Sequence, residues 1–184
     1  PQNDAAREEC RALVENALAE EGLDLFHWRE VPTDDKGLGA TAVASEPVVS
    51  QCFVRPAAGQ STDEFDRALY VGRRAVERAV DERVADSGAV VDEAAADRFY
   101  VCSLDRQTVV YKGLLKGDQL AGYYPDLTDD RLGSAFALVH ARFSTNTLGA
   151  WHLAHPYRNV VHNGEINTIR GNANWMSARE SDLD

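Results

Sequence analysis

Polar residues that are suited to chemistry follow two short apolar runs in the last third of the sequence. The first run, residues 135–139, is followed by Arg142 and Thr145, and the second ends at the pair Asn163 and Gly164. Apolar runs of this length are typical of buried strands. Because strands hold the side chains at their ends in fixed positions, we expect these polar groups to face a common cavity.

The pair Asn163-Gly164 is suited to stabilising a negatively charged oxygen. A side-chain amide and a backbone N–H that point to one place form an oxyanion hole. A helix predicted to start at Glu165 adds partial positive charge from its N-terminus. The alternative is a tight turn, in which Asn-Gly is the most typical dipeptide. These two residues alone leave both interpretations open.

Arg142 stands at the end of the first predicted strand, where a buried guanidinium needs an anion. Its two parallel N–H donors fit the α-carboxylate of an amino acid, and the hydroxyl of Thr145 offers a further contact. A structural salt bridge within the protein is the alternative. The histidines also suggest a metal site, formed by His152 and His155 with His140 or His162. No second cluster of metal ligands lies close to them, so the sequence disfavours this site.

The site lacks an attacking group. The three cysteines, Cys10, Cys52 and Cys102, are widely spaced, form no CxxC motif and fall on a predicted helix and two predicted strands. An odd number of such cysteines indicates reduced thiols in a cytoplasmic protein. The residues alone therefore predict an oxyanion hole and a carboxylate clamp without a nucleophile.

Composition excludes some classes of function. The chain has 184 residues, of which 44% are hydrophobic and 27% charged, as in an ordinary globular domain. A net charge of -11 argues against binding to nucleic acid or an anionic membrane. No apolar run is long enough to span a membrane, and no signal-peptide pattern is present. We therefore expect a cytoplasmic protein without nucleic-acid or membrane partners.

The elements that position the site follow from periodicity and turn signals. The pattern predicts antiparallel strands covered by helices, an α+β domain. Apolar residues Phe26 and Trp28 are expected in the core, and the arginines of the longest helix are expected to pair with its glutamates. Helices are predicted at 4–20, 62–86 and 165–180, strands at 23–31, 47–56, 135–143 and 158–162, and a hairpin at 99–103 and 108–114.

Several longer motifs resemble the glutaminase domain of glutamate synthase large subunits, a class II glutamine amidotransferase. They are HARFSTNT at 140–147, AHPYR at 154–158 and HNGEINTIRGNANWMSARE at 162–180. The upstream segments FYVCSLD, TVVYKGLL and YYPDL are also similar, so the resemblance covers about residues 25–180. Amidotransferases that make glucosamine phosphate or purine precursors share the Arg, Thr and Asn-Gly skeleton, but not STNT or GEINTIRGN.

The resemblance implies a fold and a set of roles. The fold would be the αββα sandwich of the N-terminal-nucleophile hydrolases, with residues 1–184 forming part of one amidotransferase type 2 domain truncated at both ends. Arg142 would hold the carboxylate of glutamine with Thr145 beside it. The Asn163 side chain and the Gly164 backbone would stabilise the oxyanion. The family's nucleophile is an N-terminal cysteine that this chain lacks, so we expect the segment alone to be inactive.

The resemblance also implies partners for a longer protein. Glutamine would be hydrolysed to glutamate, and the ammonia would pass to a synthase domain of the same polypeptide that converts 2-oxoglutarate to glutamate. FMN and an iron–sulfur cluster would belong to that protein and not to this segment. A small NAD(P)H-oxidising subunit or ferredoxin would supply electrons. The competing hypotheses are another class II amidotransferase and a non-catalytic binding module with the same fold.

Overall fold

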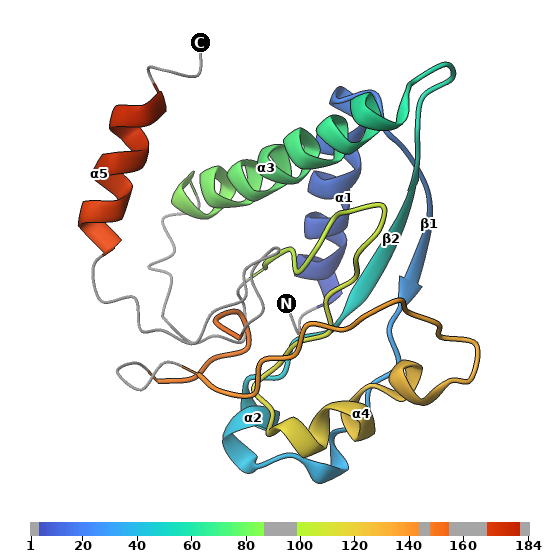
Figure 1. Ribbon diagram of the computed structural model, residues 1–184, viewed down its shortest axis with the longest axis vertical. Coiled ribbons are helices and arrows are strands. Elements are labelled where there is room, and N and C mark those ends of the chain that lie inside the picture. The colour runs from blue at the N-terminus through green and yellow to red at the C-terminus, as the bar shows by residue number, and fades with distance from the viewer. Residues whose placement is uncertain (1–3, 87–98, 144–147, 155–168, 181–184) are drawn as a thin grey trace.

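The computed structural model describes residues 4–86, 99–143, 148–154 and 169–180. Two long helices cross beside a two-stranded sheet, and several short helices gather at the other end of the molecule (Figure 1). The helices are α1 (Asp4–Glu20), α2 (Ala40–Ala44), α3 (Thr62–Asp86), α4 (Leu120–Tyr123) and α5 (Ile169–Glu180), the strands are β1 (Asp24–Glu30) and β2 (Ser50–Arg55), and the 3-10 helices are η1 (Asp35–Gly37), η3 (Gly117–Gln119) and η4 (Pro125–Thr128).

Helices α1 and α3 have the bounds that the sequence predicts. Gly22 ends α1 with a φ of 72°, a conformation that glycine adopts without strain. A reciprocal pair of hydrogen bonds between Ser61 and Glu64 begins α3: the Ser61 N–H donates to the carboxylate at 2.8 Å, and the Glu64 N–H donates to Ser61 Oγ at 3.3 Å. This is the capping box that an N-terminal serine with a glutamate three residues later indicates.

The two long helices approach each other closely at Gly72 of α3. A Cβ atom there would lie 2.9 Å from Leu18 Cδ2 of α1, so glycine makes room for the crossing. Arg73 and Arg74 of α3 both pair with Glu77, as the sequence predicts. The predicted solvated position holds for Arg74 but is wrong for Arg73, whose side chain is 19% exposed and donates to the Val101 carbonyl at 3.3 Å. The helices therefore bury one face each, as their apolar periodicity indicates.

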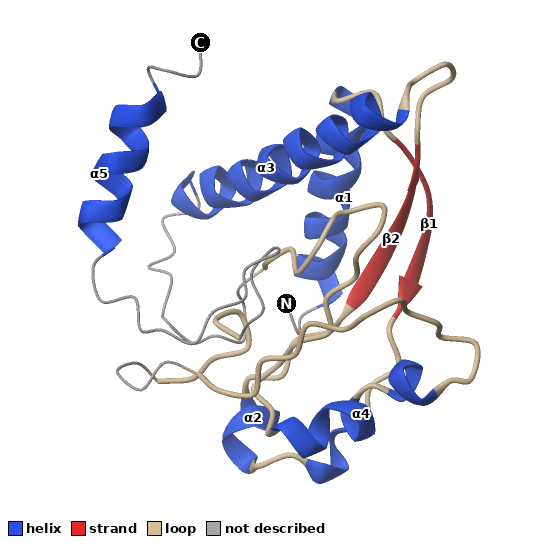
Figure 2. Ribbon diagram, viewed as in Figure 1, coloured by secondary structure: helices blue, strands red, loops and turns tan. Residues whose placement is uncertain are grey.

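Strands β1 and β2 pair antiparallel, from Asp24 opposite Arg55 to Glu30 opposite Ser50 (Figure 2). A β-bulge shifts the register between Leu25 and His27. An extra residue reverses the alternation of side chains, so Leu25 and Trp28 both face the core. The expectation for Trp28 is therefore confirmed. The expectation for Phe26 is wrong, because its side chain is 51% exposed beside the Arg55 guanidinium.

The buried residues form two clusters. The helical cluster lies between α1, α3 and the sheet, and its members are Val14, Ala17, Leu18, Leu23, Phe65, Leu69 and Val76. The aromatic cluster lies among the short helices, and its members are Val31, Ala42, Tyr123, Tyr124 and Trp151. The chain continues directly from β1 into Val31, so the sheet joins the two clusters.

Two predicted strand regions are wrong within the described part of the chain. Residues 99–114 turn at Asp105, whose carboxylate accepts the N–H groups of Gln107 and Thr108, but the two arms form no strand ladder. Residues 135–143 are likewise not a strand, and Phe136 and Val139 are 70% and 79% exposed. An apolar run becomes a strand only when a neighbour completes its hydrogen bonds, which periodicity does not reveal.

The last predicted helix is confirmed for Ile169–Glu180, which is α5. All of its residues are exposed, and it stands apart from α1 and α3 (Figure 1). The predicted strand at 158–162 and the start of this helix lie outside the described residues. A small antiparallel sheet accompanied by helices is consistent with the predicted α+β class.

Candidate functional site

The structure describes only part of the predicted site. Thr145, Asn163 and Gly164 lie outside the described residues, as do His155 and His162. The predicted meeting of Arg142 with Asn163 in a common cavity is therefore untested. Arg142 is described together with residues 99–141 before it and residues 143 and 148–154 after it, and these residues show what supports this half of the site.

The predicted burial of Arg142 is wrong, because Arg142 is exposed and the segment before it is not a strand. Its backbone N–H donates to Nδ1 of His140 at 3.3 Å. Within the described ranges Arg142 forms no ion pair. The structural salt bridge that the sequence left open is thus not observed among these residues. An exposed guanidinium with its forked donors is accessible to an anionic ligand.

Residues 112–117 run antiparallel beside the segment that contains Arg142. The neighbours are identified by the atoms that a Cβ atom added at Gly117 or Gly149 would approach. At Gly117 the Cβ would lie 3.5 Å from Cβ of Ala141, and at Gly149 it would lie 2.9 Å from Cδ1 of Leu114. Residues 112–117 therefore form the support against which residues 141–143 and 148–151 lie.

Trp151 anchors this segment in the aromatic cluster. Its side chain is 1% exposed, its Nε1–H donates to the carbonyl of Ala42 at 3.0 Å, and its ring centre lies 5.3 Å from that of Tyr123. Gly113 provides the space for the indole, since a Cβ at Gly113 would lie 2.5 Å from Trp151 Cζ3. The close approach requires glycine at this position.

Lys112 holds the same turn through its side chain. Its ammonium donates to the carbonyls of His152 at 2.9 Å and Ala154 at 3.0 Å, and it lies 5.1 Å from the ring centre of Tyr100. Burial lowers the pKa of Lys112. No motif in the sequence points to a role for Lys112. Its only signal was the scarcity of lysine, with three in the chain.

A polar network connects β1 to the same support. The Arg29 guanidinium donates two hydrogen bonds to Asp126, at 2.5 and 2.8 Å, and one to Gln51 at 2.8 Å. The Tyr111 hydroxyl also donates to Asp126, at 3.0 Å. The hydrogen bonds from Arg29, with those from Tyr111, lower the pKa of the Asp126 carboxyl. This network fixes residue 111, directly before Lys112.

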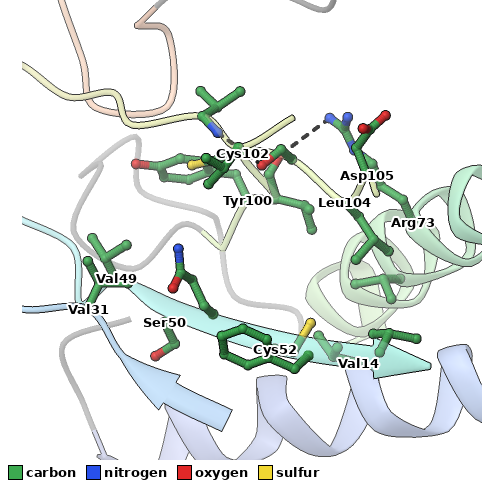
Figure 3. A pocket seen from close by; sticks show the side chains of 18 of the residues that line it. Val14, Val31, Val49, Ser50, Cys52, Arg73, Tyr100, Cys102, Leu104 and Asp105 are labelled. Atoms are coloured by element: carbon green, nitrogen blue, oxygen red, sulfur yellow. Dashed lines mark hydrogen bonds between the residues drawn. The ribbon is translucent and has the colours of Figure 1, made fainter. Parts of the chain in front are cut away.

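A cavity of about 630 Å³ is lined by residues of α1, β2 and α3 and by residues 99–111 (Figure 3). Its lining is mainly apolar and includes all three cysteines, which are free, as the sequence predicts. Figure 3 shows Cys52 on β2 and Cys102 on the opposite side of the cavity. Burial raises the pKa of each of these two thiols, which disfavours the reactive thiolate. Arg142 is not among the residues that line this cavity.

Metal binding has no support in the described part of the chain. No group of three or more His, Cys, Asp or Glu side chains there is arranged to hold a metal ion. The predicted set of histidines is incomplete in this part, because His155 and His162 lie outside it. Among the described helices, none is both long enough and apolar enough to cross a membrane.

Comparison with known proteins identifies the class. The family model of class-II glutamine amidotransferases matches residues 1–184, and the chain belongs to this family. It is 43% identical, over its whole length, to ferredoxin-dependent glutamate synthase 1 of Arabidopsis thaliana. Over 97% of its length it is 41% identical to the NADPH glutamate synthase large chain of Azospirillum brasilense and 42% identical to that of Bacillus subtilis. It spans 11% of the length of each of these relatives.

Proposed function

We propose that this chain is part of the glutaminase domain of a glutamate synthase large chain. The observation that carries the proposal is the identity of 41–43% along all or nearly all of the chain to glutamate synthases of plants and bacteria. Residues 1–184 would form part of a single domain with the αββα sandwich of N-terminal-nucleophile hydrolases. The family match and the motif that contains Asn163 and Gly164 support the same reading.

The proposed reaction is hydrolysis of the side-chain amide of glutamine. A cysteine thiol at the N-terminus of the mature polypeptide attacks the amide carbon, and the carbonyl oxygen becomes negatively charged. The Asn163 amide and the Gly164 N–H stabilise that oxygen. The C–N bond then breaks as the amide nitrogen takes up the proton released by the thiol and leaves as ammonia, and water hydrolyses the thioester to glutamate and the free thiol.

Arg142 has the proposed role of substrate anchor. Its guanidinium is exposed and forms no ion pair within the described ranges, so its donors are accessible to the α-carboxylate of glutamine. Thr145 would add a hydroxyl contact beside it. This role concerns binding in the ground state and the transition state alike, whereas the roles of Asn163 and Gly164 concern the transition state.

The rest of the longer protein would use the ammonia. In this proposal a synthase domain of the same polypeptide converts 2-oxoglutarate to glutamate in the cytoplasm, with FMN and an iron–sulfur cluster held outside this segment. Relatives named for ferredoxin and for NADPH match this chain to a similar extent, 43% and 41–42%. The similarity therefore does not discriminate between ferredoxin and an NAD(P)H-oxidising subunit as the electron donor.

The test uses the complete natural polypeptide that carries this chain. With glutamine alone, we expect equal amounts of ammonia and glutamate. With 2-oxoglutarate and a reduced electron donor added, we expect two glutamates for each glutamine and no net release of ammonia. Ammonia release that is unaffected by 2-oxoglutarate would indicate a different class II amidotransferase. Absence of any glutamine hydrolysis would favour a binding module.

A further inference from the structure

Lys112 differs from the other lysines of the chain in its surroundings. The side chain of Lys36 is 86% exposed and pairs with Asp34, and Lys116 is also exposed. Lys112 is half-buried between the aromatic cluster and residues 150–154. Placing a lysine ammonium away from water is unfavourable unless its donors find partners.

The partners of Lys112 are neutral. Its ammonium donates to two backbone carbonyls, those of His152 and Ala154, and lies over the ring of Tyr100. Throughout the described residues, no carboxylate forms an ion pair with it. A cation whose hydrogen bonds go to backbone oxygens fixes the path of the chain rather than neutralising a charge.

Among the hydrogen bonds that the described residues form, only a few besides those of Lys112 hold the turn at residues 150–154. Trp151 fixes its beginning through the hydrogen bond to Ala42. Within the turn the Leu153 N–H donates to the Ala150 carbonyl at 3.1 Å, and the Ala154 N–H donates to the Trp151 carbonyl at a long 3.4 Å. Lys112 therefore supplies the shortest hydrogen bond to a backbone atom of Ala154 that the structure shows.

We propose that Lys112 is a positioning residue for glutamine hydrolysis: it fixes the turn at His152–Ala154, which ends nine positions before the proposed oxyanion donor Asn163 in the sequence. The role rests on the proposed function. Lys112 does not touch the substrate in this proposal. It acts through the carbonyls of His152 and Ala154, so its loss should impair turnover more than glutamine binding.

The experiment compares three variants of the complete natural polypeptide. Lys112→Met removes the ammonium but keeps an unbranched side chain, Lys112→Arg keeps a cation with several donors, and Lys36→Met is the matched control on the surface. Hydrogen exchange of the Leu153 and Ala154 amides reports on the turn. We expect exchange about tenfold faster in Lys112→Met, because charge-assisted hydrogen bonds are lost, and unchanged exchange in Lys36→Met.

Steady-state glutaminase kinetics provide the functional readout. We expect kcat to fall about tenfold in Lys112→Met, with KM for glutamine changed by less than about twofold. Lys112→Arg should recover most of the loss, because its forked donors can reach two carbonyls. Lys36→Met should retain the kinetics of the unmodified protein.

Two results would overturn the positioning role. Unchanged exchange in Lys112→Met would show that the ammonium does not hold the turn. Faster exchange with unchanged kcat would show that the ammonium holds the turn for stability alone. If the unmodified polypeptide does not hydrolyse glutamine, the proposed function fails and the positioning role fails with it, while the exchange data still establish whether Lys112 holds the turn.

Discussion

Replacing Gly113 by alanine should disturb the anchoring of Trp151 directly. The new Cβ would lie 2.5 Å from Cζ3 and 2.9 Å from Cε3 of the indole ring, both closer than atoms tolerate. The ring has little freedom to move, since it is 1% exposed and packs against Tyr123. Either the ring or residues 112–114 must therefore shift.

The size of the effect follows from these contacts. Overpacking a buried site typically costs about 1–3 kcal/mol. A shift of the ring also weakens the 3.0 Å hydrogen bond from Trp151 to the Ala42 carbonyl, which is worth about 0.5–1.5 kcal/mol. We expect Gly113→Ala to lower the free energy of unfolding by about 2–4 kcal/mol. At about 2–4 °C per kcal/mol for a chain of this size, Tm should fall by roughly 4–16 °C.

Thermal unfolding followed by tryptophan fluorescence measures this change. Gly133→Ala is the matched control, because a Cβ at Gly133 meets nothing within 4 Å. The double variant Gly113→Ala/Trp151→Phe should be less destabilised than the sum of the single variants, since phenylalanine lacks the part of the indole that clashes. Equal stability of Gly113→Ala and Gly133→Ala would refute the packing argument.

The remaining predictions concern an ion pair and the substrate anchor. Because Arg29 lowers the pKa of Asp126 in the folded protein, this carboxylate contributes stability above its unfolded pKa of about 3.9, and the contribution is lost as pH falls through the lower folded pKa. Urea unfolding should therefore show a shallower loss of stability in acid for Asp126→Asn, and an unchanged slope would contradict the assignment. In the complete polypeptide, Arg142→Ala should raise KM for glutamine at least about tenfold, because a charge-assisted contact is lost, whereas the surface control Arg131→Ala should not. A loss confined to kcat would argue against the carboxylate clamp.

Local signals explain which elements the sequence predicts correctly. The extents of α1 and α3 follow from their apolar periodicity. Their ends follow from Gly22 and from the Ser61 capping box, each of which lies within a few residues of a helix end. The strand predicted at 135–143 fails because a strand depends on a partner elsewhere in the chain. The prediction that Phe26 lies in the core fails for a related reason, since a bulge changes which face of the sheet a side chain occupies.

In the candidate site, too, the features that depend on contacts between distant parts of the sequence are not predicted. Residue types and spacing predict an anchor at Arg142, and the structure shows it exposed and without an ion pair among the described residues. They do not predict Lys112, because a lysine that donates to backbone carbonyls leaves no pattern in neighbouring residues. Its role depends on contacts across 40 and 42 positions of the sequence.

The most direct test of the glutaminase proposal is the steady-state kinetics of Asn163→Ala in the complete polypeptide, with Tm measured on the same preparation. An oxyanion donor binds best once the amide oxygen gains negative charge, and its removal typically costs about 2.7–4 kcal/mol, or ~100–1000-fold in kcat. We predict this fall in kcat with KM for glutamine and Tm nearly unchanged. A normal kcat in a protein of lowered Tm would contradict the proposal and assign Asn163 to a turn.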